Sequence, residues 1–390
     1  MKTIEIPFLQ EIVALRRDIH AHPELAFEET RTSGVIAREL ESCGLEVHRG
    51  LAKTGVVGIL RRGNSGRGIG LRADMDALPL EEKSDLPYRS RNPGLKHGCG
   101  HDGHVAMLLG AARFLTCCRE APDFNGNVFF IFQPAEEGGG GARAMIEDGL
   151  FSRFPMEAVF GLHNWPEIPA GQIAVLSGPV MASDCHLKIM VKGRGCHAAM
   201  PHQGVDTLVA ASHVVLALQT VVSRNLPPWE SAVVSVTRMH GGSAMNIVPD
   251  EAFLCGTVRT FNPDTQDAVE KAIKRLCDGI GAAFGAEIGV EFERHYPPTV
   301  NSAAEAKLCL KAARKAAGVE NVRENERPST GAEDFAYMLE RKPGCYVWLG
   351  SGRPGGYALH NPNYDFNDDI IGAGIRYWVN LVEMALGKAG

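Results

Sequence analysis

The sequence predicts an α/β domain that is interrupted by an inserted α+β domain. At 390 residues the chain is longer than one ordinary hydrophobic core, so two domains are expected. Short apolar runs alternate with helical patterns in the outer parts of the chain, and polar side chains follow several of these runs. The middle part alternates apolar and polar residues as half-buried strands do. We therefore expect residues 1–182 and 298–390 to form one domain and residues 183–297 to form the insert.

Composition narrows the functional class. Hydrophobic residues make up 45% of the chain and charged residues 22%, which is typical of a globular protein. The formal net charge of −6 argues against a nucleic-acid partner. No apolar run approaches membrane-spanning length, and the N-terminus lacks the apolar core of a signal peptide. We expect a cytoplasmic protein with no membrane or nucleic-acid partner.

The N-terminal part of the chain leads to a pair of carboxylates. Helical spacing predicts helices over 8–22 and 30–42, and apolar runs predict strands over 55–60 and 68–73. The second strand continues directly into Asp74 and Asp76, whose period-two spacing points both side chains the same way. Open α/β sheets place their sites at such strand ends. A capped turn is the alternative for Asp74.

Residues 96–104 combine one thiol, one carboxylate and three imidazoles among glycines. Cys99 and His101 are two residues apart, so both can turn toward one point. Thiolate and imidazole are ligands that a borderline-soft divalent metal prefers. Residues 105–112 predict a buried helix behind this loop, with Asp102 as its N-cap. Because a closed site needs three or four ligands, other parts of the chain must supply the rest.

Further candidate ligands follow later apolar runs. The predicted strand 127–132 is followed by Glu136 and Glu137, and neighbouring carboxylates can divide metal binding and proton transfer between them. The predicted strand 158–162 ends at His163, and His360 follows the predicted strand 345–349. Five candidates exceed the needs of one tetrahedral ion, so they suggest a two-metal site. These candidates are Cys99, His101, Glu137, His163 and His360.

The insert has polar residues of its own. Strands over 185–192, 231–239, 251–260 and 288–293, with helices over 205–222 and 264–279, predict two helices packed on an antiparallel sheet. His197 and Asn246 lie in separate glycine-rich turns, and Arg259 lies within a strand. Such side chains suit an oxyanion and a carboxylate ligand. Taken singly, each also fits a structural role.

Eight motifs together resemble the metal-dependent aminoacylase, carboxypeptidase G and hippurate hydrolase superfamily, in particular its hippurate hydrolase and auxin-conjugate (IAA-amino acid) amidohydrolase branch. They are RADMDALP at 72–79, CGHDGH at 99–104, QPAEE at 133–137, GLHN at 161–164, GCHAA at 195–199, NIVP at 246–249, GAEDF at 331–335 and LHN at 359–361. The resemblance spans nearly the whole chain. It implies a doubly wound catalytic domain with a mixed sheet, and a ferredoxin-like insert that acts as a lid and forms a homodimer or homotetramer. It also implies two divalent ions per subunit, of Mn²⁺, Zn²⁺, Co²⁺ or Ni²⁺.

The resemblance also implies residue roles. The five candidate ligands above would hold the metals, Glu136 would be the general base, and Asp76 would support the site. His197 would polarise the substrate amide, while Asn246 and Arg259 would hold its carboxylate. Two positions depart from the wider pattern. Asp74 stands where a histidine ligand is usual, which Cys99 would compensate, and Cys196 stands where relatives have glycine and would narrow the site.

The implied reaction is hydrolysis of an N-acyl amino acid, such as a hippurate-like or N-acetyl conjugate, to a carboxylic acid and a free amino acid. A metallo-exopeptidase or dipeptidase would use the same site. A thiol amidase with Cys99 as nucleophile and His101 as base is a different reading, but it leaves Glu136, Glu137, His163 and His360 without a role. A non-catalytic binding protein on this scaffold is a third reading.

Overall fold

The computed structural model describes residues 4–387 of a chain that divides into two compact units. Unit 1 contains the chain up to residue 178, residues 300–327 and the chain from residue 334 onward. Unit 2 contains residues 179–299 and 328–333. The insert expected from the sequence, residues 183–297, begins four residues later and ends two residues earlier than the segment 179–299. The short segment 328–333, which belongs to unit 2, was not anticipated.

Unit 1 is built on an eight-stranded sheet with the order β1-β2-β4-β3-β5-β16-β6-β15. Its centre is parallel, since β3 pairs in parallel with β4 and β5, and β16 pairs in parallel with β5. The strands β1, β2 and β6 add antiparallel pairs. The strands are β1 (Glu46–Leu51), β2 (Gly55–Arg62), β3 (Gly68–Asp74), β4 (Gly126–Gln133), β5 (Ala158–Pro169), β6 (Ile173–Ala174), β15 (Val322–Arg323) and β16 (Gly344–Gly352).

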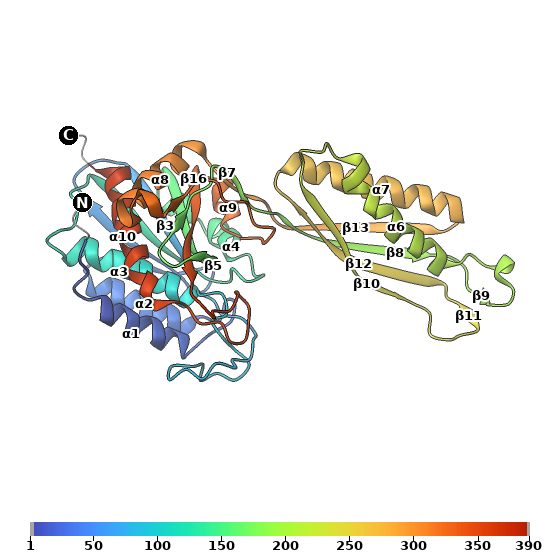
Figure 1. Ribbon diagram of the computed structural model, residues 1–390, viewed down its shortest axis with the longest axis horizontal. Coiled ribbons are helices and arrows are strands. Elements are labelled where there is room, and N and C mark those ends of the chain that lie inside the picture. Colours follow the sequence, from blue (N-terminus) through green and yellow to red (C-terminus); the bar gives the residue numbers. More distant parts are fainter. Residues whose placement is uncertain (1–3, 388–390) are drawn as a thin grey trace. The chain divides into compact units, whose positions relative to one another are not determined.

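Helices cover both faces of this sheet (Figure 1). Phe130 and Phe132 of β4 point into a core shared with the five longer helices, whereas Phe129 points to the other face and contacts the ring of Phe154. The predicted α/β class with a mixed, doubly wound sheet is therefore confirmed. The helices of the first face are α1 (Leu9–His20), α2 (Thr30–Ser42), α3 (His101–Cys117), α8 (Ala303–Ala317) and α10 (Ile371–Leu386). Shorter helices are α4 (Gly141–Glu147), α5 (Leu150–Arg153) and α9 (Ala336–Leu339).

Two local expectations for unit 1 were wrong. β5 continues to Pro169, so His163 lies inside the strand instead of following it. Asp102 does not cap α3, because the N-cap is Gly100 in the left-handed conformation, with φ of 91°. Asp102 is fully buried, with its Oδ2 2.8 Å from Nδ1 of His20 and 3.1 Å from Nε of Arg16. Buried cationic partners hold this carboxylate inside the first turn, where the helix dipole also favours a negative charge.

Unit 2 has the element order β-α-β-β-α-β of a ferredoxin-like fold. Its antiparallel sheet has the order β10-β12-β8-β13, and both helices pack on one face of it (Figure 1). The elements are β8 (Asp184–Lys192), α6 (Thr207–Asn225), β10 (Ala232–Gly241), β12 (Glu251–Thr260), α7 (Pro263–Phe284) and β13 (Glu287–Tyr296). A separate ribbon pairs β9 (Cys196–His197) with β11 (Ile247–Val248), and β7 (Gly178–Met181) pairs with β14 (Thr299–Asn301).

The helix α6 corrects one expectation about membrane-spanning length. It has 19 residues and a mean hydropathy of 1.3 over its most apolar stretch, so by length and composition it is long enough to cross a membrane. Among residues 4–387 it is the one helix that meets this test. Ala210, Val214 and Leu218 of α6 are buried in the core of unit 2. Packing on the sheet therefore accounts for the apolar character of that face.

Candidate active site

The five predicted metal ligands come together in unit 1. Sγ of Cys99, in the loop before α3, lies 3.4 Å from Nε2 of His163 on β5. Oε1 of Glu137, after β4, lies 3.2 Å from Nε2 of His360 and 4.0 Å from Nε2 of His101. The ligand atoms of Cys99, Glu137 and His360 all lie within 4.8 Å of one another. The end of β4 and the start of α3, together with β5, thus bring thiol, imidazole and carboxylate donors close to one another.

Two of these donors have the property that a bound cation requires. Nε2 of His101 and Oε1 of Glu137 are both buried and make no hydrogen bond; their nearest charged neighbours are Asp74 at 3.7 Å and the imidazole of His360 at 3.2 Å. A buried polar atom without a partner is destabilising, and native proteins avoid it unless something binds there. The residues present therefore fit a divalent metal.

Asp76 orients both of those ligands. Its Oδ1 lies 3.1 Å from Nδ1 of His101, and its Oδ2 accepts a hydrogen bond of 2.9 Å from the backbone N–H of Glu137. The backbone oxygen of Asp76 also accepts from Nδ1 of His101 at 2.9 Å. Because Nδ1 is the donor, Nε2 is left as the ligating nitrogen.

The charges around the site favour a cation. Burial raises the pKa of the Cys99 thiol well above its usual value, and the carboxylates of Glu137 and Glu136 raise it further. Burial opposes protonation of His101, but Asp74, Asp76 and Glu137 outweigh it and raise the pKa of this imidazole to about 10. The carboxylates act in the same direction on both groups, which shows that the site holds excess negative charge. A bound metal ion would supply positive charge there and convert the thiol to a thiolate ligand.

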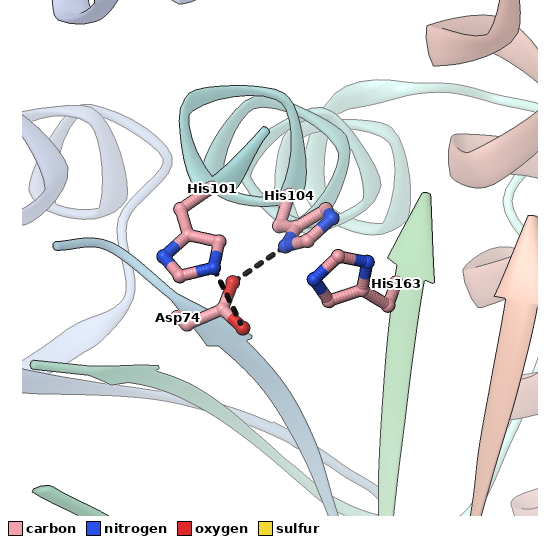
Figure 2. Close-up of side chains that lie close together, drawn as sticks. All are labelled: Asp74, His101, His104 and His163. Carbon is pink, nitrogen blue, oxygen red and sulfur yellow. Dashed lines mark hydrogen bonds and ion pairs between the residues drawn. The ribbon is translucent and has the colours of Figure 1, made fainter. Parts of the chain in front are cut away.

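Asp74 and His104 form a hydrogen-bonded pair whose role sequence reasoning missed. Figure 2 shows His101 and His104 projecting from the start of α3 toward Asp74, with His163 facing them from β5. Oδ1 of Asp74 lies 2.5 Å from Nδ1 of His104, and Oδ2 accepts from Arg72 at 2.7 Å. The signal in the sequence was the spacing of His101 and His104, since residues three apart share a helix face.

Asp74, His101, His104 and His163 also place one ligand atom each within 4.8 Å of the others, so they are a second possible metal-binding set. However, both oxygens of Asp74 already have cationic or imidazole partners. Both ring nitrogens of His104 also have partners. Nδ1 faces Asp74, and Nε2 lies 2.7 Å from the side-chain Oδ1 of Asn164 and 3.0 Å from the backbone N of the same residue. The polar atoms of Asp74 and His104 are therefore engaged in hydrogen bonds, whereas Nε2 of His101 and Oε1 of Glu137 make none.

Glu136 is buried beside the ligands. One carboxylate oxygen of Glu136 lies within 4.8 Å of ligand atoms of His101 and Glu137. Its Oε1 accepts from the backbone N–H of Asp334 at 3.4 Å. Asp334 itself accepts from Gln133 at 2.8 Å and from Arg72 at 3.1 Å. The sequence motif at 331–335 contains Asp334, but only the structure shows that this residue ties the ends of β3 and β4 together.

The three predicted substrate-contacting residues lie in unit 2. The β9–β11 ribbon pairs His197 with Ile247, which brings His197 beside Asn246. Nδ1 of His197 accepts from the backbone N–H of Ala199 at 3.1 Å, so the neutral ring carries its proton on Nε2. Arg259 is on β12, away from this ribbon in sequence and sheet, where its Nη1 pairs with Asp184.

Residues 70–384 match the family model described as Peptidase family M20/M25/M40. The chain belongs to this M20 family. The match covers more than half of the chain and includes every candidate metal ligand, and it confirms the superfamily indicated by the sequence motifs.

Individual members of the M20 family are similar over almost their full length. The hippurate hydrolase of Campylobacter jejuni is 41% identical over 371 residues, covering 95% of each chain. An IAA-amino acid hydrolase of Arabidopsis thaliana is 35% identical, covering 98% of this chain and 89% of its own. A solved structure from Bacillus subtilis, described as a dinuclear metal binding peptidase, has a TM-score of 0.86 and 34% identity, covering 98% and 99% of the two chains.

Proposed function

We propose that this M20 chain is a metal-dependent amidohydrolase that cleaves N-acyl amino acids to a carboxylic acid and a free amino acid. The observation that carries the proposal is the pair of buried ligand atoms on His101 and Glu137 that make no hydrogen bond and lie close to the other candidate donors. Two divalent ions per subunit would be held by Cys99, His101, Glu137, His163 and His360. Such ions supply a water that ionises near neutral pH and a Lewis acid for the substrate carbonyl.

The chain's own residues would move the proton and hold the substrate. Glu136 takes a proton from the attacking water, and it returns a proton to the nitrogen of the leaving amine as the carbon–nitrogen bond breaks. Asp76 keeps His101 and Glu137 in position throughout. Nε2–H of His197 donates to the developing oxyanion. Asn246 and the guanidinium of Arg259 bind the carboxylate of the amino-acid half, although Arg259 must share its charge with Asp184.

The thiol amidase reading has less support. The imidazole that contacts Sγ of Cys99, at 3.4 Å, belongs to His163 and not to the proposed base His101, and the raised pKa of Cys99 disfavours the thiolate. A non-catalytic binder is also disfavoured, because Glu136 and all five candidate ligands are present in the chain. We further propose a homodimer or homotetramer through unit 2, and a cytoplasmic location.

A hydrolysis screen tests the proposal. The protein is stripped with a chelator, reloaded separately with Mn²⁺, Zn²⁺, Co²⁺ or Ni²⁺, and offered N-acetyl, N-benzoyl and N-indoleacetyl amino acids together with dipeptides of the same C-terminal residues. We expect release of free amino acid only after metal is restored, with acyl conjugates cleaved faster than dipeptides. Faster cleavage of dipeptides would favour the exopeptidase instead. Full activity in the stripped protein, or no cleavage of any compound by metal-loaded protein, would overturn the proposal.

A further inference from the structure

Unit 2 carries a second group of metal-ligating side chains, far in sequence from the active-site ligands. His186 on β8 and Glu293 and His295 on β13 each place one ligand atom within 4.8 Å of the other two. The ring centroids of the two histidines are 4.1 Å apart. We propose that these three residues form a binding site for a divalent cation of the Zn²⁺ class, separate from the catalytic centre.

The strand patterns place these side chains on the open face of the sheet. Cys185 and Leu187 of β8 are buried under the helices, so His186 between them points to the opposite face. The register pairs His186 directly with Glu293. A β-bulge between Arg294 and Tyr296 makes His295 the extra residue of its strand, and bulges commonly re-aim a side chain. The bulge therefore accounts for a histidine that lies beside the ring of His186.

The donor set decides which cation fits. Two imidazoles with a carboxylate are typical ligands of Zn²⁺ or Cu²⁺, whereas Mg²⁺ and Ca²⁺ prefer oxygen donors throughout. The side chains of His186, Glu293 and His295 are 45%, 37% and 42% exposed, so the group lies at the surface of unit 2. An exposed site with three protein ligands leaves room for water to complete the coordination.

The two nearby carboxylates are already arranged toward the histidines. Oε1 of Glu293 accepts a hydrogen bond of 2.8 Å from Nζ of Lys188, while Oε2 lies 3.8 Å from Nε2 of His295. Asp184 shows the same division, because Oδ1 faces Arg259 while Oδ2 lies 3.6 Å from Nε2 of His186. In each case one oxygen is held by a basic side chain and the other faces an imidazole. Only His186, Glu293 and His295 bring their ligand atoms together, so Asp184 stays beside His186 as its acidic neighbour.

A metal here would link the strands by which the chain enters and leaves residues 179–299. In chain order β8 is the first and β13 the last strand of the four-stranded sheet, and in the sheet they are hydrogen-bonded neighbours. An ion that binds the folded strands but not the unfolded chain stabilises the fold by mass action. None of the three ligands has a role in the proposed hydrolysis, so the site can be tested independently of it.

Metal counting on the whole enzyme tests the site. Enzyme loaded with Mn²⁺ is equilibrated with micromolar Zn²⁺, and bound zinc is measured for wild type and for the double variant His186→Asn with His295→Asn. The control is His240→Asn, which removes an exposed histidine from β10 of the same sheet. We expect wild type and control to bind one more Zn²⁺ per chain than the double variant. Zinc should also raise the thermal unfolding temperature of the first two proteins by more than that of the double variant.

A second variant protects the test against misfolding. Glu293→Gln keeps both imidazoles and should weaken zinc binding at this site by about tenfold or more, since a neutral amide is a poorer ligand. Retained hydrolysis with Mn²⁺ shows that each variant is folded. Equal zinc counts in wild type and double variant would overturn the proposal. An extra zinc that binds wild type only at millimolar concentration, or that His240→Asn also removes, would overturn it as well.

Discussion

Oδ1 of Asp76 lies 3.1 Å from Nδ1 of His101, whose other ring nitrogen is buried without a hydrogen-bond partner. The second oxygen of Asp76 accepts from the backbone N–H of Glu137. One carboxylate thus positions two candidate ligands that are 36 residues apart in the chain. Carboxylates in this position fix the tautomer and orientation of a ligating histidine.

Asp76→Ala should therefore weaken metal binding by roughly 10- to 100-fold, the usual effect of losing such a support. Competition with a chromogenic chelator measures the affinity. Asp18→Ala, at a half-buried position of α1 that pairs with Arg31, is the control and should bind metal as wild type does. An unchanged affinity in Asp76→Ala would show that His101 and Glu137 are held in place by other contacts.

Cys99→Ala separates a metal ligand from a nucleophile. If Cys99 binds metal, the variant should lose bound metal together with turnover, and high metal concentration should restore part of the activity. A nucleophilic thiol would instead give a variant that keeps its metal and has no turnover at any metal concentration. Metal analysis and rates are measured on the same samples. Cys117→Ala, which removes an exposed cysteine, controls for nonspecific effects of thiol loss.

Glu136→Gln and Glu137→Gln should fail in different ways. Glu136→Gln removes the proton carrier, so it should keep its metal but lose several orders of magnitude in kcat. Glu137→Gln removes a ligand, so it should show weakened metal binding first. Metal content and kcat under saturating metal distinguish the two. The reverse pattern would mean that the roles of these neighbours are exchanged.

His197→Ala should lower kcat by about a hundredfold or more with metal content intact, which is the effect of losing one oxyanion donor. His202→Ala, a nearby exposed histidine, is the control and should be unaffected. A normal kcat in His197→Ala would remove the residue from the mechanism.

Subunit mixing shows which chain His197 serves. If it acts on a neighbouring subunit, mixing inactive Glu136→Gln with inactive His197→Ala should rebuild some active sites after exchange. No recovery despite demonstrated exchange would place His197 in the same chain as the metals it serves.

Glu29 should make stability depend on pH. Burial raises the pKa of this carboxyl to about 6, against the hydrogen bonds that it accepts from Thr54 and from the backbone of Ala135. The folded state therefore binds more protons than the unfolded state between about pH 4.5 and 6, so stability falls as pH rises through this window.

Glu29→Gln removes that titration. Its free energy of unfolding relative to wild type should rise by up to about 2 kcal/mol between pH 4.5 and 7 and then stay level. Thermal unfolding of metal-free protein across this range measures the difference. Glu147→Gln, at an exposed end of α4, should show no such rise. A difference that falls with pH would contradict the sign of the shift at Glu29.

Much of the fold followed from local pattern. The helix over 30–42 and the strand over 251–260 begin and end as their periodicity predicted, because their buried faces repeat with the period of their own element. The strand containing His163 was predicted too short, since beyond residue 162 β5 is stabilised by pairing with β16 and carries no apolar run of its own. The strand propensity of residues 163–169 carries no information about their pairing with β16.

The sequence by itself determined which kinds of side chain gather at the site. The thiol, imidazole and carboxylate side chains stand beside apolar runs, and parallel strands bring such positions to one edge of a sheet. Only the tertiary structure decided how each polar atom is used. Asp74 and His104 have the residue types of ligands, yet their atoms are taken by Arg72 and Asn164. Asp102 has the residue type of a helix cap, yet it pairs with Arg16, 86 residues away. Residue type sets what an atom can bind, whereas the packing of distant segments sets which partner reaches it first.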